Sequence, residues 1–105
     1  MKDKMKKIGK ISDIPEGEGR VFRLNQNDIA IFRLESGIVA IDNRCPHLGG
    51  PLADGIVAGD LVVCPLHGHR FNLKTGLSVG DDDKIKTYPV FVEGEELFIE
   101  DGFAD

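Results

Sequence analysis

Long hydrophobic runs are absent from this sequence of 105 residues, and so is a secretion signal. No apolar stretch approaches the ~20 residues needed to cross a bilayer, and the lysine-rich start is not followed by the apolar core of a signal peptide. These absences predict a cytoplasmic protein, complete as written, with no membrane partner. The pI is near 5.1 and the basic residues beyond the N-terminal tail are scattered, so no nucleic-acid partner is expected either.

Cysteine is scarce, and its scarcity narrows the chemistry that the chain can carry. Only Cys45 and Cys64 are present, together with three histidines. Because thiols inside the cell are kept reduced, two cysteines in an intracellular domain favour metal ligation over a structural disulfide.

Motifs that bind nucleotides are missing as well. No Gly-x-Gly-x-x-Gly follows a predicted strand, there is no P-loop, and no third cysteine is left for a second metal cluster. On its own, the chain is therefore not expected to oxidise a nicotinamide.

Basic charge is sparse near the C-terminus. Residues 81–105 carry two basic and nine acidic side chains, whereas residues 1–80 carry eleven basic and nine acidic ones. We expect a solvated acidic tail that aids solubility. The alternative is a docking surface for a basic redox partner, because complementary charge speeds encounter.

Sustained helical periodicity is also lacking. Thirteen glycines and five prolines instead separate short apolar segments. Four hairpins are predicted, which join 29–34 to 38–41, 56–57 to 61–63, 71–73 to 77–79, and 88–92 to 97–99. We therefore predict one domain over residues 1–105 of the all-β class, an antiparallel β-sandwich or barrel.

What the sequence does contain is a pair of mixed thiol and imidazole motifs. Cys45-Pro-His47 and Cys64-Pro-Leu-His67 are separated by sixteen residues, and each follows a predicted strand. Two cysteines on one iron and two histidines on the other are the ligands of a Rieske [2Fe–2S] centre. A proline after each cysteine stiffens its turn, and Gly68 supplies a small, conformationally free position beside the second motif. The motifs predict one-electron transfer.

Two other interpretations compete with this one. Two cysteines and two histidines are also a common structural zinc set, although zinc fingers usually group the two cysteines and the two histidines separately. A structural zinc-binding interaction module is therefore the alternative from another functional class. His69 also stands near the second motif, but His67 completes its spacing, so we expect His69 to be a solvent-facing neighbour of the cluster.

The mixed ligand set has a redox consequence. An oxidised [2Fe–2S] core carries two positive charges, which two thiolates neutralise, whereas four thiolates leave a doubly negative site. Adding an electron to the near-neutral site costs less. The reduction potential is thus expected to lie above the roughly −400 mV of all-cysteine plant-type clusters.

From Cys45 to His67 the chain resembles Rieske-type ferredoxins, and the resemblance extends from about Ile8 to Glu100. It implies the Rieske-type [2Fe–2S] fold with a two-loop cluster-binding subdomain at about 43–79. It also implies that Cys45 and Cys64 bind the inner iron, and that His47 and His67 bind the outer iron near the surface. The positions that carry an extra disulfide in respiratory cytochrome bc complexes correspond here to Gly50 and Leu66, so a low-potential member is implied.

Two groups within the superfamily are similar to this chain. The stretch 43–52, followed by Gly55-Ile56-Val57 and later by Lys86-Thr87-Tyr88-Pro89-Val90, resembles the small subunit of assimilatory NAD(P)H-dependent nitrite reductase. That resemblance implies a non-catalytic electron-transfer subunit whose partner is a large flavin and sirohaem reductase, which reduces nitrite to ammonium. Ferredoxin components of aromatic-ring dioxygenases share the ligands and a similar Thr-Tyr-Pro-Val segment. They form the alternative, with another redox protein as partner.

Overall fold

The computed structural model describes residues 5–24, 27–43, 51–64, 68–80 and 83–100. These residues form antiparallel strands and two short 3-10 helices, which confirms the all-β prediction. The elements are β1 (Met5–Lys10), η2 (Ile11–Asp13), β2 (Gly19–Leu24), β3 (Asn27–Leu34), β4 (Gly37–Asp42), η3 (Leu52–Asp54), β5 (Ile56–Ala58), β6 (Leu61–Val63), β7 (Arg70–Asn72), β8 (Thr87–Tyr88), β9 (Val90–Glu93) and β10 (Glu96–Glu100).

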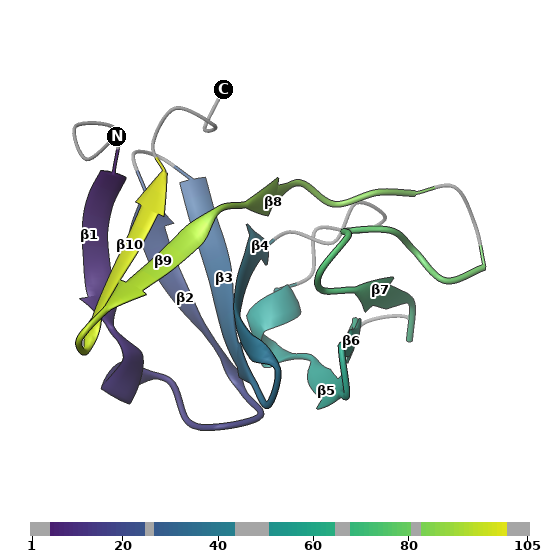
Figure 1. The fold of residues 1–105 in the computed structure, drawn as a ribbon. Helices are drawn as coiled ribbons and strands as arrows, with labels where there is room; N and C mark the ends of the chain where they lie inside the picture. The colour runs from purple at the N-terminus through teal and green to yellow at the C-terminus, as the bar shows by residue number, and fades with distance from the viewer. Residues whose placement is uncertain (1–4, 25–26, 44–50, 65–67, 81–82, 101–105) are drawn as a thin grey trace.

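The strands form three antiparallel sheets (Figure 1). The orders are β1-β10-β9, β2-β3-β4-β8 and β5-β6-β7. Pro89 lies between β8, which pairs with β4, and β9, which pairs with β10, so the chain crosses from the second sheet to the first at this residue. A proline suits that crossing because it has no N–H to donate to a ladder.

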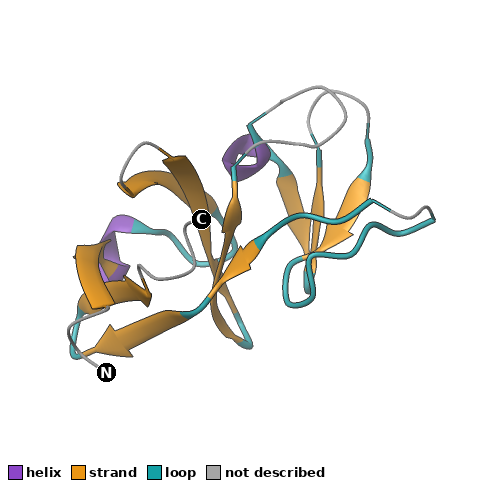
Figure 2. Cartoon of the chain, turned by 90° about the horizontal axis from the view of Figure 1, so that it is seen from above, coloured by secondary structure: helices purple, strands orange, loops and turns teal. Residues whose placement is uncertain are grey.

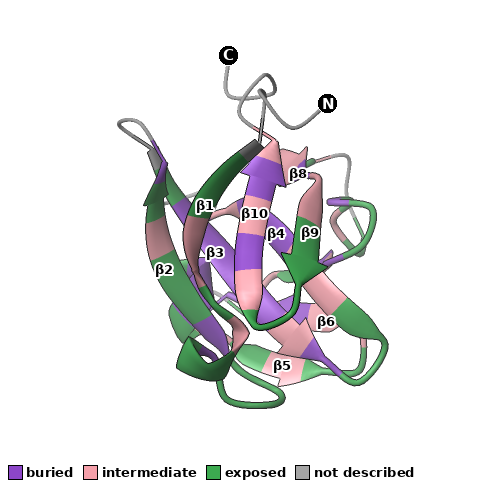
Figure 3. Ribbon diagram, turned by 60° about the vertical axis from the view of Figure 1, so that its left-hand side comes forward, coloured by how far each residue is buried: buried purple, intermediate pink, exposed green. Residues whose placement is uncertain are grey.

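Strand β3 is the central strand of the molecule because it is buried on both faces (Figure 3). Ile29 and Ile31 join the core that includes Leu97 of β10, whereas Ala30 and Phe32 join the core that includes Phe71 of β7. Alternate side chains of a strand point to opposite faces, so β3 has one core on each side. This burial explains why residues 29–32 of β3 are continuously apolar instead of alternating.

The predicted hairpins are largely confirmed. The ladders β3–β4, β5–β6 and β9–β10 lie where the turn signals placed them. The third prediction was partly wrong, because 77–79 forms no named strand and joins β7 only through an isolated bridge between Phe71 and Ser78.

Two strands were not predicted at all. Strand β1 is rich in lysine and pairs with β10, where Lys7 Nζ lies 2.8 Å from Glu96 Oε2 and lowers the pKa of that carboxyl. Strand β2 pairs with β3 along its whole length. No helix in the described part of the chain is long and apolar enough to span a bilayer.

Candidate metal centre

Of the four predicted ligands, the structure describes one. Cys45, His47 and His67 lie outside the described residues, and Cys64 lies directly after β6. Within the described ranges, no three His, Cys, Asp or Glu side chains come close enough together to hold a metal ion. The described part of the site is therefore Cys64 together with the residues that flank the two segments carrying the predicted ligands.

Cys64 is a free thiol at the start of a tight turn. It is 2% exposed and packs among buried apolar side chains that include Val62 and Phe71. Its N–H donates to the carbonyl of His69 at 2.7 Å, and the N–H of Gly68 donates back to the Cys64 carbonyl at 3.0 Å. Gly68 has a φ of +73°, a left-handed conformation that favours glycine. The second motif is thus closed by two backbone hydrogen bonds across a short turn.

Asn43 closes the segment that carries the first motif. It follows β4 and is 9% exposed. Its N–H donates to the carbonyl of Asp28 at 3.0 Å, and its carbonyl accepts from Leu52 N–H at 2.7 Å. Its side-chain Oδ1 accepts from Ala53 N–H at 2.8 Å. A single asparagine therefore ties the end of β4 to the start of η3.

The residues that Asn43 binds and the turn that begins at Cys64 meet in one part of the core. Leu52, Ala53 and Cys64 belong to the same buried cluster. Between them, Gly55 lies so close to β6 that an added Cβ would overlap the Val63 carbonyl oxygen and lie 2.9 Å from Val62 Cγ2. The absence of a side chain at Gly55 is what allows the end of η3 to approach the strand that leads into Cys64.

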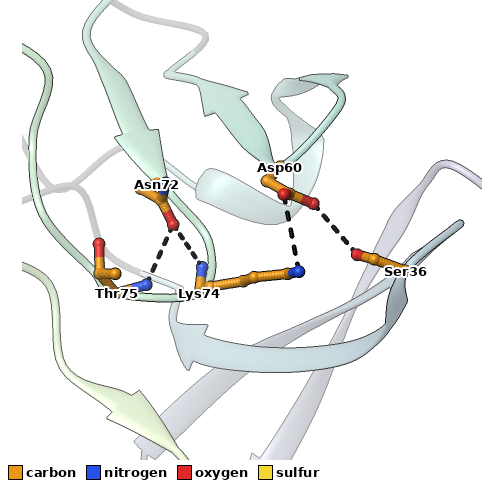
Figure 4. Close-up of polar contacts among 5 residues, drawn as sticks. All are labelled: Ser36, Asp60, Asn72, Lys74 and Thr75. Carbon is orange, nitrogen blue, oxygen red and sulfur yellow. Dashed lines mark hydrogen bonds and ion pairs between the residues drawn. The ribbon is translucent and has the colours of Figure 1, made fainter.

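A cluster of polar contacts lies at the start of β6, at the end of the strand opposite Cys64 (Figure 4). Asp60, in the β5–β6 turn, accepts from Ser36 Oγ at 3.1 Å and lies 3.7 Å from Lys74 Nζ. Asn72 Oδ1 accepts from the N–H groups of Lys74 and Thr75 at 2.9 and 3.1 Å. The exposed ion pair contributes little by itself. Together these contacts join the β3–β4 turn to the sheet that carries Cys64.

Tyr88 interacts with Asp42, which is the last residue of β4 and directly precedes Asn43. Its hydroxyl donates to Asp42 Oδ1 at 2.7 Å. Burial raises the pKa of the Tyr88 phenol well above its usual range, and the hydrogen bond to the Asp42 carboxylate and its negative charge raise that pKa further. The phenol is thus held neutral beside a carboxylate.

His69 is only partly as expected. The residue is half-buried, not fully solvent-facing, and its Nδ1 atom is withdrawn from solvent. The physical reason is its position across from Cys64 in the turn, where its carbonyl accepts the Cys64 N–H.

Residues 4–89 match the Rieske [2Fe–2S] domain. This chain belongs to the Rieske family. The family implies a [2Fe–2S] cluster and electron transfer, which favours the iron–sulfur hypothesis over the structural zinc module.

Two curated relatives are ferredoxins of dioxygenase systems. The Rieske chain is 37% identical over 91 residues to the ferredoxin component of the naphthalene 1,2-dioxygenase/salicylate 5-hydroxylase systems of Ralstonia sp, which covers 85% of this chain and 88% of the relative. It is 39% identical over 94 residues to the 3-phenylpropionate/cinnamic acid dioxygenase ferredoxin subunit of Escherichia coli strain K12. That match covers 86% of this chain and 87% of the relative.

A solved structure assigned as the small subunit of an NADH-dependent nitrite reductase from Mycobacterium tuberculosis shares the fold. Its TM-score is 0.82 at 23% identity, covering 90% of this chain and 92% of that one. At that identity the likeness shows the fold alone. The expectation that placed this Rieske domain first among nitrite reductase subunits is thus less well supported than its alternative.

The described residues fit the cluster that the Rieske family implies. Cys64 offers a free thiol, the soft ligand that iron–sulfur clusters take, and its backbone N–H and carbonyl are held by hydrogen bonds to His69 and Gly68. The closing role of Asn43 was not predicted from the sequence. An asparagine that follows a strand, two residues before a predicted ligand motif, is the signal that points to it, because its side chain readily binds nearby backbone N–H groups.

Proposed function

We propose that this chain is the ferredoxin of an aromatic-ring dioxygenase system. It would carry electrons one at a time from an NAD(P)H-dependent flavoprotein reductase to a terminal oxygenase. The observation that supports this proposal is the 37–39% identity to dioxygenase ferredoxins over most of both chains. The chain would act in the cytoplasm, where NAD(P)H is available, and would not itself be a catalyst.

We assign the cluster to the ligand set predicted from the sequence. Cys45 and Cys64 would bind the inner iron, and His47 and His67 the outer iron. The bound cluster supplies a site that gains and loses a single electron. The protein's part is to fix its two ligand-bearing segments, through Asn43 at the first and the Cys64–His69 turn at the second.

The cluster-binding subdomain would span about residues 43–79. The sheet β5-β6-β7 and both closures fall within that range. The remaining two sheets would form a rigid base, since they enclose a core of their own around Ile31 and Leu97.

Stopped-flow reoxidation tests the proposal. The cluster-loaded protein, reduced anaerobically, is mixed either with the oxygenase of a naphthalene 1,2-dioxygenase system or with the large subunit of an NADH-dependent nitrite reductase supplied with nitrite. The expected result is rapid recovery of the visible bands of the oxidised cluster with the oxygenase and not with the nitrite reductase. Reoxidation by the nitrite reductase alone would contradict the proposal and restore the first expectation.

A further inference from the structure

The outer face of the sheet β5-β6-β7 is apolar although it is turned toward solvent. The register pairs Ile56 with Val63 and Val63 with Arg70, and Val79 N–H donates to the Arg70 carbonyl. Residues that pair across antiparallel strands point to the same side. These four side chains therefore form one row, and a second row on the same face contains Ala58, Leu61, Asn72 and Leu77.

The opposite face of this sheet is the one that packs inward. Val62 and Phe71, which lie between the two outer rows, are fully buried. By contrast, Ile56 is 73% exposed, Leu77 51% and Val79 45%. In the described part of the chain, these are three of the six large apolar side chains that are exposed. Ile56 lies beside the half-buried Leu61 and Val63 on one side of β7, and Leu77 and Val79 lie on its other side. Single exposed apolar residues are common, but exposed apolar residues that gather on one face mark an interaction site.

Arg70 gives this face its charge. It is exposed between Val63 and Val79 in the first row, and it takes part in none of the ion pairs formed among residues 5–24, 27–43, 51–64, 68–80 and 83–100. Lys84, which is bridged to Leu77, adds a second exposed cation at the edge. Arg70 is thus the one charged side chain within the two rows of this face, in a chain whose net charge is −5.

The charge decides between two occupants. A second copy related by a two-fold axis would bring Arg70 of each copy toward its mate, since such an interface pairs a patch with itself. Like charges held close together in an apolar contact are unfavourable. A different protein that is apolar and presents a carboxylate opposite Arg70 satisfies both features of the face.

The location of the face connects it to electron transfer. Val63 immediately precedes Cys64, and Arg70 immediately follows His69, so the first row lies one residue, about 3.3 Å along a strand, from the ligand-bearing turn. We propose that the outer face of β5-β6-β7 docks an electron-transfer partner whose contact surface is apolar and carries an acidic group that pairs with Arg70. This inference rests on the proposed function and names the surface that function uses.

Two substitutions on this face, each with a matched control, test the inference. Val79→Glu is compared with Val21→Glu, because Val21 is 47% exposed on β2 of another sheet. Arg70→Glu is compared with Arg23→Glu, which is also exposed on β2. The cluster-loaded variants are assayed as electron carriers between the reductase and the oxygenase of a naphthalene 1,2-dioxygenase system. Their visible spectrum and reduction potential are recorded as measures of an intact site.

We expect Val79→Glu and Arg70→Glu to raise the KM for the ferredoxin with at least one partner by about tenfold, because each places a carboxylate where the interface excludes water or needs a cation. Their spectrum and potential stay at the wild-type values. Val21→Glu and Arg23→Glu should change the KM by less than about twofold, as surface substitutions away from an interface do.

Two results would overturn the inference, and a third would reject the proposed function on which it rests. Values of KM for Val79→Glu and Arg70→Glu equal to those of their controls would reject the surface while leaving the proposed function intact. A dimer in sedimentation that Val79→Glu dissociates would show that a second copy occupies the face. A wild-type protein that exchanges electrons with neither partner would instead reject the proposed function itself.

Discussion

Asn43 Oδ1 lies 2.8 Å from the backbone nitrogen of Ala53 and closes the segment between them. Asn43 is buried, and so is Ala53. A buried N–H without an acceptor costs free energy comparable to a lost hydrogen bond. Asn43 thus holds together the residues on either side of the segment that carries the first proposed ligands.

Replacing Asn43 by leucine should destabilise the protein and loosen the first ligand segment. The Ala53 N–H then loses its acceptor, which costs about 1–3 kcal/mol. Asn43→Asp keeps an oxygen at the same place and should retain most of the stability. Chemical denaturation gives the free energy of unfolding, and the decay of visible absorbance in chelator gives the lifetime of the cluster. Equal cluster lifetimes in Asn43→Leu and Asn43→Asp would contradict the closing role.

Gly55→Ala should separate η3 from β6. The new Cβ overlaps the Val63 carbonyl oxygen, which belongs to the backbone and has little room to move. Overpacking of this kind costs about 1–3 kcal/mol. Gly17→Ala is the control, because Gly17 has a φ of +78° but nothing within 4 Å of an added Cβ. The midpoint temperature of thermal unfolding and the cluster content should both fall for Gly55→Ala. The control Gly17→Ala should leave the cluster content unchanged.

The Tyr88–Asp42 pair predicts a loss of stability in alkali. In the fold the pKa of the phenol is raised, so Tyr88 keeps its proton at a pH where the unfolded chain, with a phenol pKa of about 10, releases it. The unfolded state then binds fewer protons than the native state, and stability falls as pH rises above about 10.

Tyr88→Phe isolates this contribution. The variant should be less stable than the wild type near neutral pH by about 1 kcal/mol, the value of one hydrogen bond. The difference should shrink as pH rises above about 10. Urea denaturation of the two proteins from pH 7 to 12 measures it. A difference that is constant over that range would show that the phenol pKa is not raised.

The assignment of His67 over His69 is testable with two alanine variants. His67→Ala should strip or bleach the cluster because it removes the proposed ligand to the outer iron, whereas His69→Ala should keep the visible bands. The reason is that His69 contributes its backbone carbonyl to the Cys64 turn, and alanine preserves that carbonyl. An unchanged spectrum for His67→Ala would show that the ligand assignment is wrong.

The hairpins were predictable because each is formed by neighbouring segments of the sequence and is marked by the residues of its turn. Gly59 and Gly94 lie in turns between apolar segments, and Gly37 begins β4 directly after such a turn. All three have a positive φ, as tight turns require. Strand β1 was not predictable in this way. Its sequence, Met-Lys-Lys-Ile-Gly-Lys, has low strand propensity and becomes a strand by pairing with β10, more than eighty residues later.

The same contrast between local sequence signals and contacts made in the fold applies to the candidate site. The four metal donors were predicted from residue type and spacing, because few chemistries use two thiolates and two imidazoles in this order, and their assignment stays a prediction. The supports did not follow, since each depends on contacts between distant segments. Gly55 packs against β6, and Asn43 Oδ1 accepts a hydrogen bond from the Ala53 N–H. The Tyr88 hydroxyl donates to Asp42, which lies forty-six residues earlier in the sequence.

An anaerobic redox titration followed by electron paramagnetic resonance tests the central claim most directly. Cluster-loaded protein should take up one electron per chain, with nitrogen couplings from two imidazoles and a potential between about −150 and +300 mV, the range of mixed Cys and His clusters. A potential near −400 mV without nitrogen coupling, or a colourless protein that contains zinc, would contradict it.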